Sequence, residues 1–146
     1  MIYEIQSGFR DQHSTNFCLS YLNNKVLTGF DSGLFTGMIL IDLQKAFDTI
    51  DHSILLEKME IIGFSEKTIK WYQSYLSDRT FFVSIEKSLS SAGSLNCGVP
   101  QGSILGPLLF LLYINDLKQA SESTLLYADD SCIIYQNKDI KQIETQ

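Results

Sequence analysis

Cysteine and histidine are scarce in this sequence, and that scarcity bears on metal binding. The 146 residues include three cysteines and two histidines; the cysteines are widely separated and no CxxC pair is present. Structural zinc sites are built mainly from clustered cysteine and histidine ligands. We therefore do not expect a zinc site.

Long hydrophobic runs are also missing. The first residues, MIYEIQSGFR, lack the apolar region of a signal peptide. The most apolar run, residues 104–114, is too short to span a bilayer and contains Gly106 and Pro107. We expect this run to form a buried core helix. We further expect no membrane association and a reducing intracellular compartment, which is where proteins without a secretory signal remain.

Positive charge is scarce as well. Lys and Arg number 11 and Asp and Glu number 17, which gives a formal net charge of -6. This balance argues against a free-standing nucleic-acid clamp, because neutralising phosphates requires a basic surface. It leaves room for a metal site built from carboxylates. Hydrophobic residues make up 45% of the chain, enough for the core of one domain or of a piece of a larger one.

Apolar residues recur at helical spacing in several segments, and turn-forming residues mark where helices start and stop. Residues 98–107 form a loop rich in glycine and proline that precedes the apolar run. The pattern predicts helices over residues 16–27, over residues 54–62 with Gly63 as C-cap, from a Ser65 cap to Leu76, through the apolar run to near Leu117, and at the C-terminal end.

Short apolar or β-branched runs predict strands. The sequence predicts a loop over residues 31–37 and then a buried strand over residues 38–41 that ends on Asp42. It predicts a strand over residues 80–85, a serine-rich turn over residues 88–94, and a second strand reaching Cys97. Residues 125–128 and 132–135 flank Asp129 and Asp130, which is the form of a β-hairpin with two acids at its tip.

The acids at this tip have two interpretations. An acidic turn that projects into water needs no further explanation. The apolar flanks LLYA and CIIY, however, would bury both strands and draw Asp129 and Asp130 inward, where unpaired charge is unfavourable. Together with Asp42 they would form a cluster of hard oxygen ligands suited to Mg²⁺.

Four motifs then occur in a distinctive order. They are QSGFR at residues 6–10, IDLQKAFD at residues 41–48, GVPQGSILGP at residues 98–107 and YADD at residues 127–130. In this order they resemble the reverse transcriptases of non-long-terminal-repeat retrotransposons, the LINE-like elements, particularly the jockey and chicken-repeat-like branches. The resemblance covers about residues 5–136, and each motif alone would be weak evidence.

The resemblance implies an α+β fold, the right-handed-palm polymerase core, with an antiparallel sheet backed by helices. About residues 1–37 would be the end of incomplete fingers, and about residues 38–146 the palm with an inserted fingers segment. No thumb is expected within this sequence. The remaining fingers and thumb of a parent polyprotein would then supply much of the basic surface, and the location would be the nucleus or cytoplasm.

The activity implied is RNA-directed DNA polymerase: extension of a DNA primer on an RNA template with dNTPs. Two Mg²⁺ ions per site, with Mn²⁺ as an alternative, would lie about 3.5–4 Å apart. Their ligands would be Asp42, the backbone carbonyl of Leu43, Asp129 and Asp130. We expect Asp42 and Asp129 to bridge both metals and Asp130 to support them, because adjacent strand residues point to opposite faces.

Other residues receive roles from the same resemblance. Phe47 and Ala46 would lie beneath the incoming sugar, where a phenyl ring leaves no room for a 2′-hydroxyl. The alternative for Phe47 is an ordinary core aromatic. Gln101 and Gly102 would contact the nucleotide or template; a plain glycine-rich connection would explain the glycine but not the glutamine. Arg10 would contact the nucleotide or template; the alternative is an ordinary solvated surface residue. Tyr127 and Ala128 would support the hairpin.

Two nearby residues are expected to have structural roles. Lys45 could contact a phosphate, but a helix-surface lysine is the preferred interpretation, and His52 is expected at a helix entry. Three alternatives to an active reverse transcriptase remain. A truncated, inactive relic of a mobile element is opposed by the intact acids. A viral RNA-dependent RNA polymerase palm is opposed by Phe47 and by the alanine of YADD. A domesticated nucleic-acid-binding module is opposed by the acidic charge.

Overall fold

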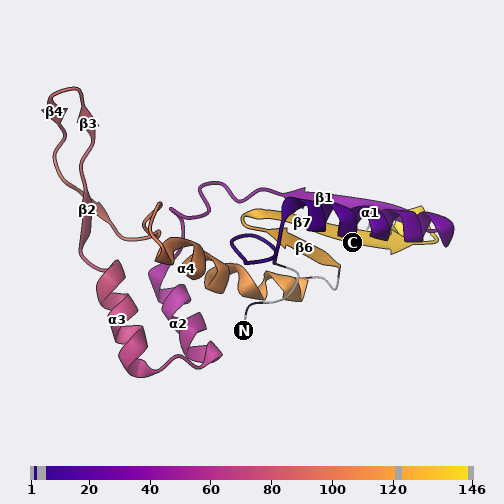
Figure 1. Ribbon diagram of the computed structural model, residues 1–146, viewed down its shortest axis with the longest axis horizontal. Coiled ribbons are helices and arrows are strands. Elements are labelled where there is room, and N and C mark those ends of the chain that lie inside the picture. Colours follow the sequence, from indigo (N-terminus) through magenta and orange to yellow (C-terminus); the bar gives the residue numbers. More distant parts are fainter. Residues whose placement is uncertain (1, 3–5, 121–122, 145–146) are drawn as a thin grey trace. The chain divides into compact units, whose positions relative to one another are not determined.

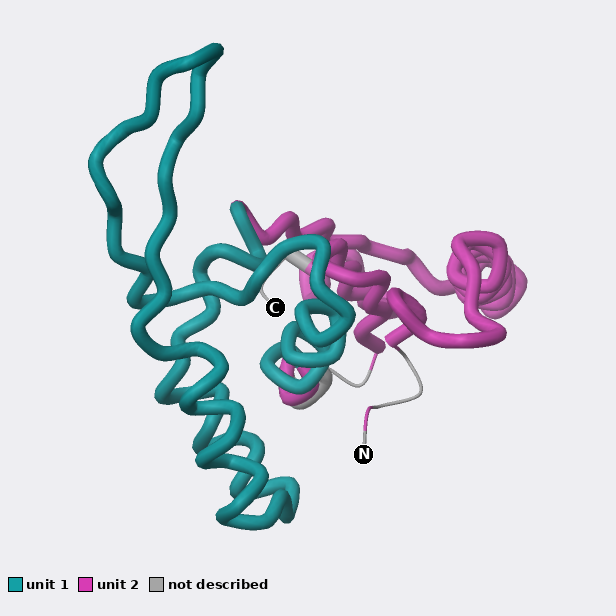
Figure 2. The backbone as a smooth tube through the Cα atoms, turned by 60° about the vertical axis from the view of Figure 1, so that its left-hand side comes forward, with its two compact units in different colours: residues 1, 45–114 teal, residues 2–44, 115–146 magenta. Residues whose placement is uncertain are grey.

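The computed structural model describes residue 2, residues 6–120 and residues 123–144. The chain divides into two compact units (Figure 2). Unit 1 contains residues 45–114, and unit 2 is assembled from residues 2–44 and 115–146. Unit 2 therefore joins two stretches of chain that are far apart in sequence.

The described part of unit 2 contains an antiparallel sheet with the strand order β1-β7-β6 (Figure 1). Its strands are β1 (Phe35–Ile41), β6 (Thr124–Tyr127) and β7 (Asp130–Asn137). Ile41 and Leu126 both pair with Ser131. This register places Asp42 one residue beyond the last β1–β7 pair, beside the start of β7.

Helix α1 (Thr15–Asp31) covers one face of this sheet. Its first turn is capped by Ser14, whose hydroxyl accepts a hydrogen bond from the amide of Phe17. Cys18 of α1 packs in a buried cluster with residues of β6 and β7: Leu125, Cys132 and Ile134. A 3₁₀ segment, η1 (Asn115–Ala120), and a short helix, α5 (Ile140–Glu144), complete the unit.

Unit 1 is built around α2 (His52–Ile62), α3 (Glu66–Leu76) and α4 (Leu105–Ile114). Asp51 caps α2 and Ser65 caps α3. Gly63 ends α2 in the left-handed conformation, with φ of 101°, which glycine adopts at low cost. The core includes fully buried apolar side chains from these helices and the preceding turn: Ile50, Leu55, Met59, Leu76, Leu109 and Phe110.

A long hairpin leaves the helices of unit 1 (Figure 1). Near its base, β2 (Arg79–Phe81) pairs with β5 (Gly93–Leu95), and near its tip, β3 (Ser84–Ile85) pairs with β4 (Ser88–Leu89). The sequence predicted one continuous strand over residues 80–85 and a turn over residues 88–94. That prediction places the turn wrongly. Ile85 pairs with Ser88, so the turn lies at residues 86–87, where Glu86 adopts a φ of 52°.

The predictions of α1, α2, α3, α5 and the acidic hairpin are confirmed, and β1 and α4 need correction. The predicted loop over residues 31–37 is too long, because β1 already begins at Phe35. The apolar run ends as an α-helix at Ile114 and continues as 3₁₀. The second hairpin strand ends at Leu95 and does not reach Cys97.

The predicted buried strand is exposed in the described residues. Met38, Ile39 and Leu40 keep 50%, 47% and 78% of their surface. The physical reason is that neither face of this edge strand is fully covered by the described elements: Ile39 and Leu40 point to opposite faces, and both are exposed. Mixed α/β architecture with antiparallel sheets is observed. No helix among the described residues is long and apolar enough to cross a membrane.

Candidate active site

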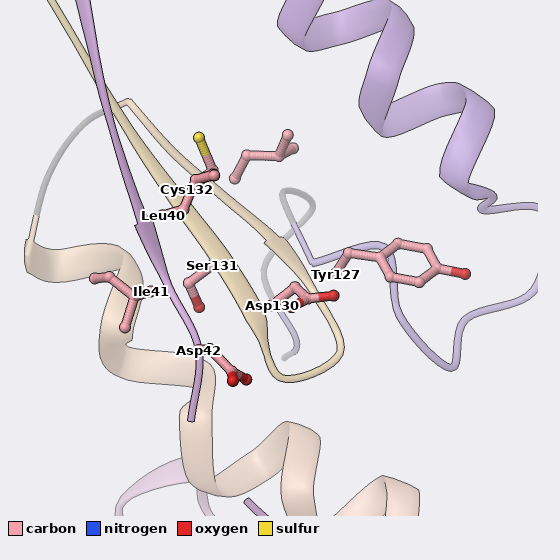
Figure 3. Close-up of a pocket in the computed structure, with 8 residues that line it drawn as sticks. Leu40, Ile41, Asp42, Tyr127, Asp130, Ser131 and Cys132 are labelled. Atoms are coloured by element: carbon pink, nitrogen blue, oxygen red, sulfur yellow. The ribbon is translucent and has the colours of Figure 1, made fainter. Parts of the chain in front are cut away.

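The acidic hairpin and the end of β1 form one pocket in unit 2. Asp42 follows the last residue of β1, and Asp130 is the first residue of β7. Both line a pocket of about 360 Å³, together with apolar side chains of all three strands (Figure 3). The β1–β7 register is what brings these carboxylates to one place, although they are far apart in the sequence.

Asp129 lies in the hairpin turn and not in a strand. Tyr127 pairs with Asp130, so Ala128 and Asp129 form the turn itself. Asp130 lines the pocket with Asp42, and Asp129 is not among the lining residues. We expected Asp129 to bridge the metals with Asp42 and Asp130 to support them, because adjacent strand residues point to opposite faces. This expectation assumed regular strand geometry at both residues. A turn at Ala128 and Asp129 removes that assumption. Close approach of Asp42 and Asp129 stays a prediction.

Asp42 and Asp130 suit a magnesium ion that keeps water ligands better than a metal ion held by protein side chains alone. No group of three His, Cys, Asp or Glu side chains lies close enough to hold a metal among the residues with described positions. Mg²⁺ is usually bound through one or two carboxylates, with water and substrate phosphates filling the remaining positions. Asp42 and Asp130, both exposed to solvent, provide such a pair of oxygen donors.

The apolar side of the pocket holds a thiol. Burial raises the pKa of the Cys132 thiol above its ordinary value, which keeps it protonated at neutral pH. Tyr127 lies on the same rim and also packs against the buried cluster of Cys18, Leu125 and Ile134. The predicted support of the hairpin by Tyr127 is consistent with this packing.

Arg10 is held by the backbone of its own segment. Its guanidinium Nη1 donates a hydrogen bond to the carbonyl oxygen of Gln6 at 3.0 Å. This bond gives Arg10 a structural role that the sequence did not suggest, and its expected nucleotide contact stays a prediction. The sequence also gave no sign of a separate role for Gln6, which stands in the QSGFR motif.

The residues expected to contact the sugar and the template, apart from Arg10, lie in unit 1, whereas Leu43 and Ala128 lie in unit 2. Ala46 is buried, and the half-buried Phe47 ring stacks on Phe110 with 4.8 Å between ring centroids. Lys45 lies in a turn with φ of 53° and not on a helix surface, so that prediction is wrong. The backbone after Asp42 turns before α2 begins, which the apolar pattern of the segment does not encode.

Within unit 1 the IDLQKAFD and GVPQGS motifs are bonded to each other. The side-chain nitrogen of Gln101 donates to a carboxylate oxygen of Asp48 at 2.7 Å. The amide of Val99 donates to the carbonyl of Phe47 at 2.9 Å. Gly98 has a φ of 80°, and a Cβ there would lie 2.7 Å from the carbonyl oxygen of Asp48. Only glycine fits this approach.

Two further residues of this loop are placed by the structure. His52 is the first residue of α2, as expected, and its Nε2 donates to the carbonyl of Gly98 at 2.7 Å. Gly102 is exposed with a φ of 78°. The sequence alone gave Asp48 no role of its own; its carboxylate accepts the hydrogen bond from Gln101 and so orients the glutamine.

Comparisons with known proteins show the family of the chain. The family model described as reverse transcriptase (RNA-dependent DNA polymerase) matches residues 1–145. The chain is 36% identical over 141 residues to the probable RNA-directed DNA polymerase from transposon BS of Drosophila melanogaster, covering 89% of this chain and 15% of that protein. It is 33% identical over 148 residues to the RNA-directed DNA polymerase from mobile element jockey of the same species, covering 95% and 16%.

The matches extend over most of the chain but over a small part of each relative. The chain spans about 15% of the length of the curated relatives that it matches. The resemblance drawn from the four motifs is confirmed. The chain belongs to the reverse transcriptase family, and its relatives are the RNA-directed DNA polymerases of non-long-terminal-repeat retrotransposons, jockey among them.

Proposed function

We propose that this chain carries the metal-binding palm of an RNA-directed DNA polymerase. The observation that supports this most directly is the pocket shared by Asp42 and Asp130, from the end of β1 and the start of β7. The polymerase would extend a DNA primer on an RNA template with dNTPs. Residues 1–37 would belong to the fingers and residues 38–146 to the palm with its fingers insertion.

The chemistry needs carboxylates where charge develops. The primer 3′-hydroxyl attacks the α-phosphorus of the dNTP, a new P–O bond forms, and pyrophosphate leaves. Asp42, Asp129, Asp130 and the carbonyl of Leu43 would hold two Mg²⁺ ions. When bound, these ions lower the pKa of the hydroxyl and neutralise the triphosphate and its leaving group. The protein supplies fixed oxygen ligands and an apolar wall.

Residues of unit 1 would select and orient the nucleotide. Phe47 and Ala46 would contact the sugar, with the phenyl ring excluding a 2′-hydroxyl. Gln101 would contact the nucleotide or template, and the hydrogen bond that its amide donates to Asp48 supports a fixed orientation of that amide. Gly102, in its left-handed conformation, would let the backbone approach a phosphate. Arg10, in unit 2, would contact the nucleotide or template.

The test is primer extension by the full-length polymerase that contains this chain. We expect dNTP-dependent extension on an RNA template, and its loss in Asp42→Asn and in Asp130→Asn. Asp139→Asn is the matched control, because Asp139 is an exposed aspartate of unit 2 that does not line the pocket. Extension at the parent rate by Asp42→Asn would refute the proposal.

Substrate controls separate the alternatives. Extension with ribonucleotides alone would favour the alternative function, a viral RNA-dependent RNA polymerase. A folded protein that binds Mg²⁺ and never extends a primer would favour the inactive relic. The proposed fingers and thumb partners would be needed for the assay, since the chain spans only about 15% of its relatives.

A further inference from the structure

Gln6 is a buried polar residue whose side chain makes three hydrogen bonds. It keeps 2% of its surface exposed. Its Oε1 accepts hydrogen bonds from the amides of Gly8 at 2.7 Å and Ala128 at 2.9 Å, and its Nε2 donates to the carbonyl of Ala128 at 3.2 Å. A buried amide is tolerated only with such partners. One side chain thus binds both backbone polar groups of Ala128.

Ala128 is the residue that sets the acidic turn. It lies between Tyr127 and Asp129 and adopts a φ of 54°. A residue with a Cβ is strained in this left-handed region and stays there only when its surroundings fix it. The two hydrogen bonds between the Gln6 side chain and the Ala128 backbone are such a constraint, and the residues that follow directly are Asp129 and Asp130.

The segment around Gln6 is pressed against the same turn. Gln6 forms a parallel bridge with Leu126, and the amide of Ser7 donates to the carbonyl of Leu126 at 2.9 Å. A Cβ on Gly8 would lie 2.1 Å from the amide nitrogen of Ala128. Arg10 in turn donates to the carbonyl of Gln6. These contacts all lie within unit 2, so residues 6–10 form a support beneath the hairpin turn.

We propose that Gln6 is a positioning residue for the acidic hairpin. Its amide fixes the conformation of Ala128 and, through it, the directions in which the side chains of Asp129 and Asp130 leave the turn, with Asp130 lining the pocket that it shares with Asp42. The inference rests on the proposed polymerase function. It explains why an amide is needed: the side chain must accept from one amide of the turn residue and donate to its carbonyl at the same time.

The variants follow from that chemistry. Gln6→Met keeps the length and removes all three hydrogen bonds. Gln136→Met is the matched control, because Gln136 is a partly buried glutamine of the same unit. Its Nε2 donates to the carbonyl of Lys25 at 2.8 Å and to the hydroxyl of Thr36 at 3.1 Å, away from the turn. Both variants should lower the melting temperature of the chain, but only Gln6→Met should disturb the turn.

The first measurement needs no activity. In the NMR spectrum of the metal-free chain, the amide signals of Asp129 and Asp130 should shift in Gln6→Met and stay in place in Gln136→Met. The Mg²⁺ dissociation constant should rise about 10-fold or more in Gln6→Met alone, the range seen when groups behind metal ligands are removed. Unchanged hairpin signals and unchanged Mg²⁺ affinity in Gln6→Met would overturn the inference.

The second measurement uses the full-length polymerase at a temperature where every variant is folded. Gln6→Met should lower kcat about 10–100-fold and raise the half-saturating Mg²⁺ concentration, with little change in KM for dNTP. Gln136→Met should leave all three at parent values. A parent that never extends a primer refutes the proposed function, whereas an active parent matched by Gln6→Met refutes only the positioning role.

A second variant covers the case in which Gln6→Met fails to fold. Gln6→Glu retains the acceptor, but an ionised carboxylate cannot donate to the Ala128 carbonyl. A protonated carboxyl group can, and burial favours the protonated form. The rate of Gln6→Glu relative to the parent should therefore rise as the pH is lowered from about 8 towards about 6. A ratio that stays constant with pH would contradict the required donation to Ala128.

Discussion

At the scale of single residues, Phe47 has a structural role beside its proposed one. Its ring stacks on Phe110, which is buried in the core of unit 1. The core-aromatic interpretation and the sugar-selection interpretation are therefore compatible: packing against Phe110 would hold the ring rigid, and a rigid ring is what steric exclusion of a 2′-hydroxyl requires. Experiments on Phe47 must separate the two effects.

Replacing Phe47 by valine should admit ribonucleotides while deoxynucleotide incorporation persists. We expect ribonucleotide incorporation to rise about tenfold or more relative to deoxynucleotide, the range for relieving a steric conflict of this size. The measurement is single-nucleotide extension by the full-length polymerase with paired rNTP and dNTP substrates. Phe64→Val is the control, because Phe64 is a half-buried aromatic of unit 1 that packs on Tyr72. Parent-level exclusion of ribonucleotides by Phe47→Val would remove Phe47 as the gate.

At the scale of elements, Gly8 tests how closely residues 6–10 lie against the hairpin turn. A Cβ at Gly8 would lie 2.1 Å from the Ala128 amide nitrogen and 2.5 Å from its Cα, so Gly8→Ala requires the backbone of one segment to move. Overpacking of this kind costs about 1–3 kcal/mol. Gly8→Ala should therefore lower the free energy of unfolding and abolish extension.

Gly33→Ala is its matched control. Gly33 has a φ of 66°, but a Cβ there would meet nothing within 4 Å. Alanine in this conformation costs about 1–2 kcal/mol, so urea unfolding should show a loss of stability comparable with that of Gly8→Ala. Extension by Gly33→Ala should persist at the parent level. If both variants extend primers equally well, the turn tolerates displacement and its position does not limit the reaction.

The elements that sequence predicts well are those specified by local chemistry. Ser65 and Gly63 mark a helix start and a helix end through their own side chain or lack of one, and YADD between apolar runs predicts a hairpin. Exposure of Leu40 and the pairing of Ile41 with Ser131 depend instead on which strands are neighbours. The bond between Gln6 and Ala128 joins residues separated by 122 positions. No local pattern encodes such a contact.

At the scale of the whole molecule, the four motifs divide between the two units. The acids and the QSGFR segment lie in unit 2, which is formed by the two ends of the chain. Phe47, Asp48 and Gln101 lie in unit 1, where hydrogen bonds join the second and third motifs. The candidate metal site therefore depends on chain segments before residue 45 and after residue 114 being present together.

The charge of the chain limits what it can do by itself. Duplex affinity rises with the number of phosphates that Lys and Arg neutralise. With 11 basic against 17 acidic residues and a net charge of -6, the field of this chain should repel nucleic acid rather than attract it. We predict weak binding of the isolated 146 residues to an RNA–DNA primer-template, with added Mg²⁺ offsetting the repulsion only in part.

Fluorescence anisotropy with a labelled primer-template, at several salt concentrations, measures this directly, and primer extension follows in the same buffer. Extension by the isolated chain should be undetectable or very slow even with Asp42, Asp129 and Asp130 intact, because chemistry at the metal site requires a bound primer terminus. The full-length polymerase, with the additional chain of its relatives, is the positive control. Tight binding at about 0.15 M salt, with extension that disappears in Asp129→Ala, would mean that these residues alone hold the primer-template. The few basic residues of the chain would then have to lie together along the binding path of the primer-template.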